Sequence, residues 1–232
     1  MHIFRSIKNR TMEMGKSICS LPKNIYFNFK VLPLRQAIKL PIYVDYGVKI
    51  QEVYKNVIEI DDDNVYRYMI SFGRGGSDGI AKTSKGIISF KDTTRIVFEG
   101  PAQFHSGVRL WADENAVLRF GKNFSANKNF TLFYNDEIFF GQDCMVGWNV
   151  EIIDGNGHSV INDNIKKSNT CKITIGNHVW IGANVKICRS VKIGDNSIVA
   201  YGSTVVGGCF GSYVMLGGYP AKVIKNNVNW EK

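Results

Sequence analysis

An aliphatic residue recurs at every sixth position through the C-terminal half of the chain. These positions are Ile175, Ile181, Ile187, Ile193, Val199 and Val205. The residue that follows is usually small, as in Gly176, Gly182, Gly194 and Ala200, and a second small or β-branched residue stands four places after each aliphatic one. A period of six fits neither an α-helix, at 3.6, nor a single alternating strand, at 2. It predicts an all-β fold, a parallel β-helix with three short strands in each coil.

The physical demands of such a coil explain the residue types. Each coil turns three corners around a triangular core and stacks on the next coil through parallel backbone hydrogen bonds. The aliphatic side chain points inward, and its neighbour is small because the chain bends there. Polar pairs such as Asn177-His178 and Asp195-Asn196 suit corners that need unusual backbone angles.

The same phase continues upstream, less regularly. It runs through Phe120-Gly121, Ala126 and Leu132 and, after a slip of two residues, through Phe140-Gly141, Val146 and Ile152. Phe98, Phe104 and Leu110 keep the spacing, but with aromatic residues among them. We therefore expect the β-helix to begin between residues 80 and 96. We assign it to residues 81–216, followed by a C-terminal tail over residues 217–232.

Two segments depart from the repeat. The rhythm breaks between Ile152 and Ile175, which predicts a loop extruded from the coil over residues 154–172. Residues 1–80 show no period of six, and we expect them to cover the edge of the first coil, since an open edge invites aggregation. An alternative for this segment is a basic, aromatic element that contacts a membrane surface. Its basic residues would be Lys8, Arg10, Lys16, Lys23, Lys30, Arg35 and Lys39.

Composition narrows the classes of function. The formal net charge of +9 favours anionic partners, yet no zinc-finger, helix-turn-helix or RNA-binding signature is present, so nucleic acid is not expected. Five cysteines without a CxxC pair argue against a disulfide framework or a thiolate zinc site, and no two of the four histidines have ligand spacing, so no metal is expected. No apolar run is long enough to span a bilayer, and the cytoplasm is the expected compartment.

At residues 120–225 the chain resembles a known family. The densest match runs from Ile173 to Gly182, then from Val191 to Asn196, and it closes with Gly218-Tyr219-Pro220-Ala221-Lys222-Val223-Ile224. These segments resemble the hexapeptide-repeat acyltransferases, and among them the galactoside, maltose and nodulation-factor O-acetyltransferases. The N-terminal part looks more like that of bacterial surface-polysaccharide acyltransferases.

The resemblance implies a fold, partners and a reaction. The fold would be a left-handed β-helix, assembled as a homotrimer. Acetyl-CoA would lie in the groove between adjacent helices, and a sugar or polysaccharide acceptor would meet it at a subunit interface. Transfer of acetyl to a nitrogen of a nucleotide-linked amino sugar and a non-catalytic β-helix scaffold are the alternatives.

His158 is the expected catalytic base. Transfer from a thioester to a hydroxyl requires removal of the hydroxyl proton, and neutral imidazole suits that task near neutral pH. His158 stands at the start of the predicted loop, where the resembling enzymes carry their catalytic histidine. The alternative is a loop histidine that only hydrogen-bonds a turn.

The resemblance also assigns residues around the acceptor. Asn127 matches an asparagine that binds the acceptor hydroxyl or the oxyanion, although a turn asparagine is an equal alternative. Asn135, with Asp136 beside it, stands where the family has an acidic residue that binds the sugar, and this departure leaves the acceptor open. Trp180 is expected to point outward, either as an aromatic wall of the pocket or as packing between subunits.

The remaining assignments concern the cofactor. Gly182 and Ala183 match positions in the groove whose small size lets the backbone reach the cofactor. Tyr201 replaces a small residue usual there, so that the main chain at Tyr201 and Gly202 would make the contact. Lys222 matches a basic position near the nucleotide phosphates, with a solvated lysine as its alternative.

Overall fold

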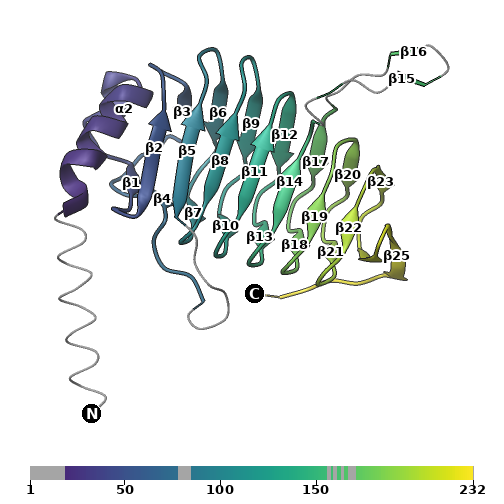
Figure 1. Ribbon diagram of the computed structural model, residues 1–232. Helices are drawn as coiled ribbons and strands as arrows, with labels where there is room; N and C mark the ends of the chain where they lie inside the picture. The colour runs from purple at the N-terminus through teal and green to yellow at the C-terminus, as the bar shows by residue number, and fades with distance from the viewer. Residues whose placement is uncertain are drawn as a thin grey trace.

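The computed structural model describes residues 19–77, 85–155, 158, 161–162, 165–166 and 171–231. Three parallel sheets form the walls of a triangular prism, and the chain visits them in turn, so that seven complete coils stack along one axis (Figure 1). The prediction of a parallel β-helix is confirmed.

We call the three walls sheets A, B and C. Sheet A contains β1 (Ile42–Val44), β4 (Ile70–Phe72), β7 (Ala102–Phe104), β10 (Phe124–Ala126), β13 (Met145–Val146), β18 (Trp180–Ile181), β21 (Ile198–Val199), β24 (Val214–Gly218) and β25 (Ala221–Asn226), of which only β25 runs antiparallel to its neighbour. Sheet B contains β2 (Val48–Glu52), β5 (Gly86–Phe90), β8 (Arg109–Ala112), β11 (Thr131–Tyr134), β14 (Glu151–Ile153), β19 (Lys186–Ile187) and β22 (Thr204–Val205). Sheet C contains β3 (Ile58–Ile60), β6 (Arg95–Phe98), β9 (Val117–Phe120), β12 (Glu137–Phe140), β17 (Ile173–Ile175), β20 (Val191–Ile193) and β23 (Gly208–Phe210).

The core changes character along the prism. In the middle coils it is aromatic: the rings of Phe98 and Phe120 stack at 5.2 Å between centroids, and those of Phe120 and Phe140 at 5.4 Å. On the next two coils the same column continues with Ile175 and Ile193. Large rings fill in the earlier coils the space that aliphatic side chains fill in the later ones. The repeat is therefore hardest to recognise where the core is most aromatic.

The β-helix begins earlier than the sequence predicted. Its first coil starts at Ile42, in the segment assigned to a non-repeating cap, and β4 already lies in the second coil. The period is hidden there because long corners separate the strands: residues 61–69 connect β3 to β4, and residues 73–85 connect β4 to β5. At the other end β24 extends sheet A through Gly218, so the boundary at residue 216 divides a strand.

A helix over the described residues 19–31 closes the first coil. Asn28 pairs with both backbone groups of Ile42 in β1: its Nδ2 donates to the carbonyl at 2.7 Å, and its Oδ1 accepts from the amide at 3.0 Å. Asn24 Oδ1 accepts from the amide of Val44 at 2.6 Å. Lys23 Nζ donates to three backbone carbonyls, those of residues 45, 46 and 48. Side chains thus replace the missing neighbouring strand.

The short helix α2 (Leu34–Ala37) extends this cover to the third wall, since Gln36 Nε2 donates to the carbonyl of Ile60 in β3 at 2.7 Å. Within the described part of the chain, no helix is long and apolar enough to cross a bilayer.

Replacing Asn28 by alanine tests this cover. The buried amide and carbonyl of Ile42 would lose their partners, and each unsatisfied buried group costs about 1–3 kcal/mol. We expect the free energy of unfolding, measured by urea titration, to fall by about 2–4 kcal/mol. Asn64→Ala, at an exposed asparagine, is the matched control and should change it by less than about 0.5 kcal/mol. Equal values for the two variants would contradict this role of Asn28.

Candidate active site

Most of the predicted site residues lie at two different corners of the prism. We call the corner that leads from sheet A to sheet B the A–B corner, and the one that leads from sheet B to sheet C the B–C corner. Each strand of sheet B runs from the first corner to the second, so the two corners are opposite edges of the same wall. Figure 1 shows β7, β10 and β13 at one edge of this wall, and β15 (Ile161–Asn162) and β16 (Ile165–Lys166) beyond the other.

His158 belongs to the B–C corner. It lies between β14 and β17, where the chain leaves the coil, and it is exposed. The structure thus places a departure from the coil where the sequence predicts the loop of residues 154–172. Within this departure β15 and β16 form an antiparallel pair, and residues 156, 157, 159, 160, 163, 164 and 167–170 lie outside the described residues.

Asp154 anchors this corner. Its buried carboxylate accepts hydrogen bonds from the backbone amides of Asn135 at 2.8 Å and Asp136 at 2.9 Å, and its own carbonyl accepts from the amide of Cys171 at 3.1 Å. The two ends of the excursion are therefore held together at a fixed point of the coil, and His158 stands four residues beyond it. Asn135 and Asp136, expected to bind the sugar, contribute backbone donors to this anchor.

Burial governs the ionisation of the anchor. Desolvation raises the pKa of Asp154, and the two backbone donors counteract part of that rise. Tyr134 lies beneath, fully buried, and desolvation followed by the nearby Asp154 charge raises the pKa of its hydroxyl well above the ordinary value. Tyr134 therefore stays neutral at physiological pH.

Asn127 belongs to the A–B corner, where a second group of polar residues surrounds it. Its Oδ1 accepts from the amides of Ser77 at 3.2 Å and Lys128 at 2.8 Å, and its Nδ2 donates to Ser77 Oγ at 2.9 Å. Residues 73–77, which leave the coil after β4, pass over this corner: Ser106 Oγ donates to the carbonyls of Gly73 and Gly75. The side-chain amide of Asn127 therefore holds residues 73–77 against the corner through its hydrogen bonds to Ser77.

His105 occupies the same corner one coil below Asn127. Because Phe104 pairs with Ala126, the two side chains are neighbours in adjacent coils. Burial lowers the pKa of His105, opposed by a hydrogen bond to Asn127 and assisted by the positive charge of Lys128. Lys128 itself is almost fully buried, at 7% exposure. The corner thus contains a partly buried imidazole and a buried lysine, neither of which the sequence predicted as a site residue.

An asparagine ladder continues along the A–B corner. Asn129 Nδ2 donates to Asn149 Oδ1 at 2.8 Å, Asn149 Nδ2 to Asn184 Oδ1 at 3.0 Å, and Asn184 Nδ2 to the Tyr201 hydroxyl. All three asparagines have positive φ, a conformation that asparagine tolerates better than most residues. The ladder forms a polar rail along the edge where Gly182, Ala183, Tyr201 and Gly202 were expected to contact the cofactor.

The small residues on this rail have different reasons to be small. A β-carbon on Gly182 would lie 2.8 Å from the carbonyl of Val199, so the stacking of the next coil already excludes a side chain. Gly202 faces open space but has φ of +71°. Ala183 is buried at 6% exposure, whereas Tyr201 is 69% exposed. Of these four residues, Tyr201 and Gly202 are exposed to a ligand in a single chain, whereas Gly182 and Ala183 are buried.

Trp180 lies away from both corners, whereas Lys222 lies by the A–B corner, because its partner Gly217 directly follows Leu216, which pairs with Val199. Trp180 points outward from sheet A, is 38% exposed and lies 6.1 Å from the ring of Trp230 in the C-terminal tail. Trp230 stacks on His178 at 4.1 Å and donates to the His178 carbonyl. Lys222 is exposed in β25, opposite Gly217 of β24. The contacts of Trp180 are with the tail of its own chain.

The other nucleophile and ligand candidates are structural. Burial raises the pKa of the Cys144 thiol to about 12, and its Sγ donates to the carbonyl of Gly176. Burial also raises the pKa of Cys188. The described residues contain no group of three or more His, Cys, Asp and Glu side chains that could hold a metal.

The sequence therefore found both corners but missed part of each. Ser77 and His105 gave no repeat signal, because Ser77 lies within the long corner after β4 and His105 replaces a small residue. A signal did exist for the ladder: Asn129, Asn149 and Asn184 each directly precede an inward-facing residue. Asp154 could not be recognised as an anchor without the fold.

The lowered pKa of His105 predicts a pH dependence of stability. The unfolded chain takes up a proton near pH 6.5, whereas the folded chain resists protonation until a lower pH. The contribution of neutral His105 to the free energy of unfolding is therefore fully present above pH 6.5, and it is lost as the pH falls below that value. We expect urea midpoints measured at pH 7.5 and about 5.5 to differ less for His105→Gln than for the wild type. An identical difference in both proteins would contradict the assignment.

Comparison with known proteins agrees with the architecture. Residues 172–207 match the family model of the bacterial transferase hexapeptide (six repeats). The galactoside O-acetyltransferase of Escherichia coli is 36% identical over 110 residues, which cover 47% of this chain and 53% of that protein. The polysialic acid O-acetyltransferase of Neisseria meningitidis is 32% identical over 111 residues, covering 47% and 52% respectively. The matches thus span about half the length of these curated relatives.

The solved structures include the polySia-specific acetyltransferase NeuO. It superimposes with a TM-score of 0.59 at 20% identity, covering 82% of this chain and 79% of that one. At this identity the likeness concerns the fold. The chain is a left-handed parallel β-helix built on hexapeptide repeats, and the curated proteins that it resembles include galactoside and polysialic acid O-acetyltransferases.

Proposed function

We propose that the protein is a cytoplasmic, acetyl-CoA-dependent O-acetyltransferase that acts on a sugar hydroxyl of a bacterial surface polysaccharide or its precursor. The observation that carries the proposal is the place of His158: an exposed imidazole four residues beyond a buried anchor, where the chain leaves the coil. The names of the relatives supply the class of reaction, and the polysialic acid enzymes among them favour a polymeric acceptor.

The residues would divide the work as follows. His158 accepts the proton of the acceptor hydroxyl as its oxygen attacks the thioester carbonyl. The new C–O bond forms, the C–S bond breaks, and His158 returns the proton to the departing thiolate. Donors at the A–B corner, from Asn127 and the backbone, would stabilise the oxyanion. The rail from Asn149 to Tyr201, with Lys222, would hold the pantetheine and nucleotide of acetyl-CoA.

This division requires more than one chain. Asn127 and His158 stand at opposite edges of sheet B, separated by the length of a strand and its corners, on the order of 20 Å. A site that contains both residues is complete only if the A–B corner of one copy meets the B–C corner of another. Three such contacts close a ring, which supports the homotrimer implied by the resemblance. Sheet B of each copy would then face the three-fold axis.

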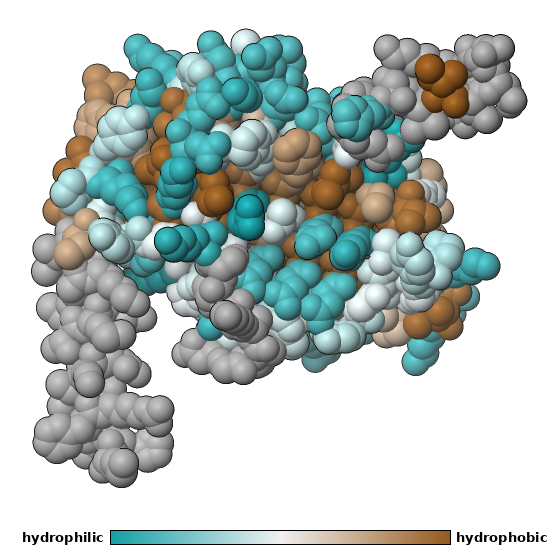
Figure 2. Space-filling view, in the orientation of Figure 1, coloured by the Kyte–Doolittle hydropathy of each residue, from teal (hydrophilic) through white to brown (hydrophobic). Residues whose placement is uncertain are grey.

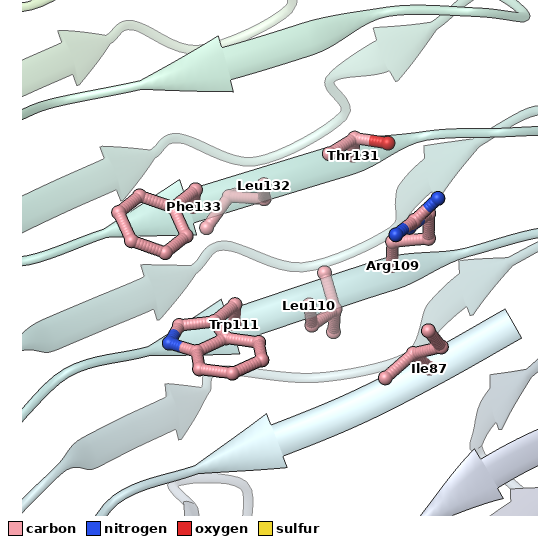
Figure 3. A pocket seen from close by; sticks show the side chains of 7 residues that line it. All are labelled: Ile87, Arg109, Leu110, Trp111, Thr131, Leu132 and Phe133. Carbon is pink, nitrogen blue, oxygen red and sulfur yellow. The ribbon is translucent and has the colours of Figure 1, made fainter. Parts of the chain in front are cut away.

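The outer surface of sheet B is suited to such a position. Trp111 and Phe133 lie on adjacent coils with ring centroids 6.2 Å apart, and Ile153 on the next coil is 40% exposed. Figure 2 shows apolar patches across this wall. A shallow hollow of about 140 Å³ opens there (Figure 3). It is lined by Ile87, Arg109, Leu110, Trp111, Thr131, Leu132 and Phe133. Burying this surface between copies would remove apolar area from water.

Replacing His158 by alanine tests the base. With acetyl-CoA and a panel of bacterial polysaccharides and amino sugars, we expect acceptor-dependent release of free thiol to fall about 10²- to 10⁴-fold. Lys192→Ala, an exposed residue on sheet C, is the control and should keep wild-type activity. Undiminished activity in His158→Ala would exclude His158 as the base. Release with amino sugars alone would favour N-acetylation, and a folded protein that does not bind CoA would favour a scaffold.

Mixing two inactive variants tests the shared site. His158→Ala and Asn127→Ala should each be impaired alone, while trimers formed by co-expression should recover about a quarter of the sites, those in which an intact His158 faces an intact Asn127. Light scattering would verify that the mixed species is a trimer. Activity of the mixture no greater than the mean of the two variants would contradict a site shared between copies.

A further inference from the structure

The helix over residues 19–31 has an apolar outer face. Ile25, Tyr26 and Phe29 are 43%, 56% and 46% exposed, and Pro22 beside them is also exposed. A helix on the surface of a globular protein normally turns its polar side chains to water. Here the polar side chains point the other way: Asn24 and Asn28 are fully buried against β1.

The orientation of this helix is fixed. Asn24 and Asn28 replace the missing strand next to β1, and Phe27 is fully buried in the core. A rotation that hid the outer face would break these hydrogen bonds and expose the edge of the first coil. The apolar face is therefore a consequence of the cap and stays turned outward.

The apolar surface continues on the neighbouring segment. Leu34 and Ile38, in and directly after α2, are 68% and 63% exposed. Figure 2 shows apolar residues at the end of the molecule where Figure 1 draws this helix and α2. Lys30, Arg35 and Lys39 lie among these residues in the sequence, and no Asp or Glu occurs between residues 14 and 44.

Positive charge is concentrated in the stretch of sequence that contains this helix. Residues 1–44 contain eight Lys and Arg and one Glu, a formal +7 out of the +9 of the whole chain. The remaining 188 residues are nearly balanced, at +2. Lys8, Arg10 and Lys16, which belong to this basic part of the sequence, lie outside the described residues. Within the described residues 19–44, Lys23, Lys30, Arg35 and Lys39 face no Asp or Glu in the same stretch of sequence, and this excess favours an anionic partner for the segment.

We propose that this end docks peripherally on an anionic lipid bilayer. Ile25, Tyr26, Phe29, Leu34 and Ile38 enter the interfacial layer, and Lys30, Arg35 and Lys39 contact lipid phosphates. Apolar and aromatic side chains flanked by cations are the combination by which interfacial helices bind anionic membranes. A second copy stacked on this face is disfavoured, because it would bring Lys30, Arg35 and Lys39 of the two copies together. The inference is independent of the proposed transfer reaction.

Vesicle sedimentation with the full-length chain tests the proposal. We expect the protein to sediment with vesicles of phosphatidylglycerol and phosphatidylcholine, and to stay in the supernatant with phosphatidylcholine alone. Raising the ionic strength to about 0.5 M should weaken binding strongly, since the Debye length shortens. The charge variant Lys30→Glu/Arg35→Glu/Lys39→Glu should reduce the partition coefficient at least about tenfold.

A second set of variants examines the apolar contribution. Ile25→Ser/Tyr26→Ser/Phe29→Ser changes only exposed side chains and should reduce binding at least about tenfold. Val223→Ser/Ile224→Ser, exposed in β25 at the other end of the prism, is the matched control and should bind like the wild type. Equal binding to neutral and anionic vesicles, or none to either, would overturn the proposal. So would self-association that the Ser variant abolishes, because a second copy would then occupy this face.

Discussion

The close approach of successive coils constrains the whole molecule. Parallel strands lie about 4.8 Å apart, so every corner of one coil rests directly on the same corner of the next. A β-carbon on Gly121 or Gly147 would come within 2.4 Å or 2.6 Å of the backbone of the following coil. Residues at these places must be small or adopt positive φ. This requirement explains why a small residue recurs every six positions in the sequence. The backbones of successive coils can then form hydrogen bonds, because no side chain lies between them.

This constraint also decides where chemistry can develop. Apolar side chains of the repeat fill the core, and regular strands form the walls, so irregular backbone and the polar groups that it carries occur along the corners and at the places where the chain leaves the coil. Asn129, Asn149 and Asn184 share one edge because each occupies the same position of its coil. His158 belongs to the excursion at the B–C corner, and residues 73–77, which include Ser77, belong to the one at the A–B corner. In the proposed function these two excursions are the two halves of one site, which association of copies completes.

The sequence predicts the features that the six-residue repeat determines, and it does not predict those that depend on irregular corners. The parallel β-helix, the departure from the coil between β14 and β17, and the A–B corner positions from Gly182 to Gly202 all follow from period six. The start at Ile42 does not, because the corners between β3 and β5 are long and the core there contains Phe72 and Phe98 instead of aliphatic residues. Contacts between distant residues, such as Ser77 with Asn127, leave no local pattern to find.

The anchor at Asp154 has an evolutionary consequence. Since its carboxylate binds the preceding coil and its carbonyl binds Cys171, the excursion begins and ends at neighbouring points, whatever lies between them. Insertions or deletions in the intervening segment leave the stacking of the coils intact. For the transferase proposed above, acceptor preference could then diversify among descendants of one ancestor through changes in loop length alone, while the histidine keeps its distance of four residues from the anchor.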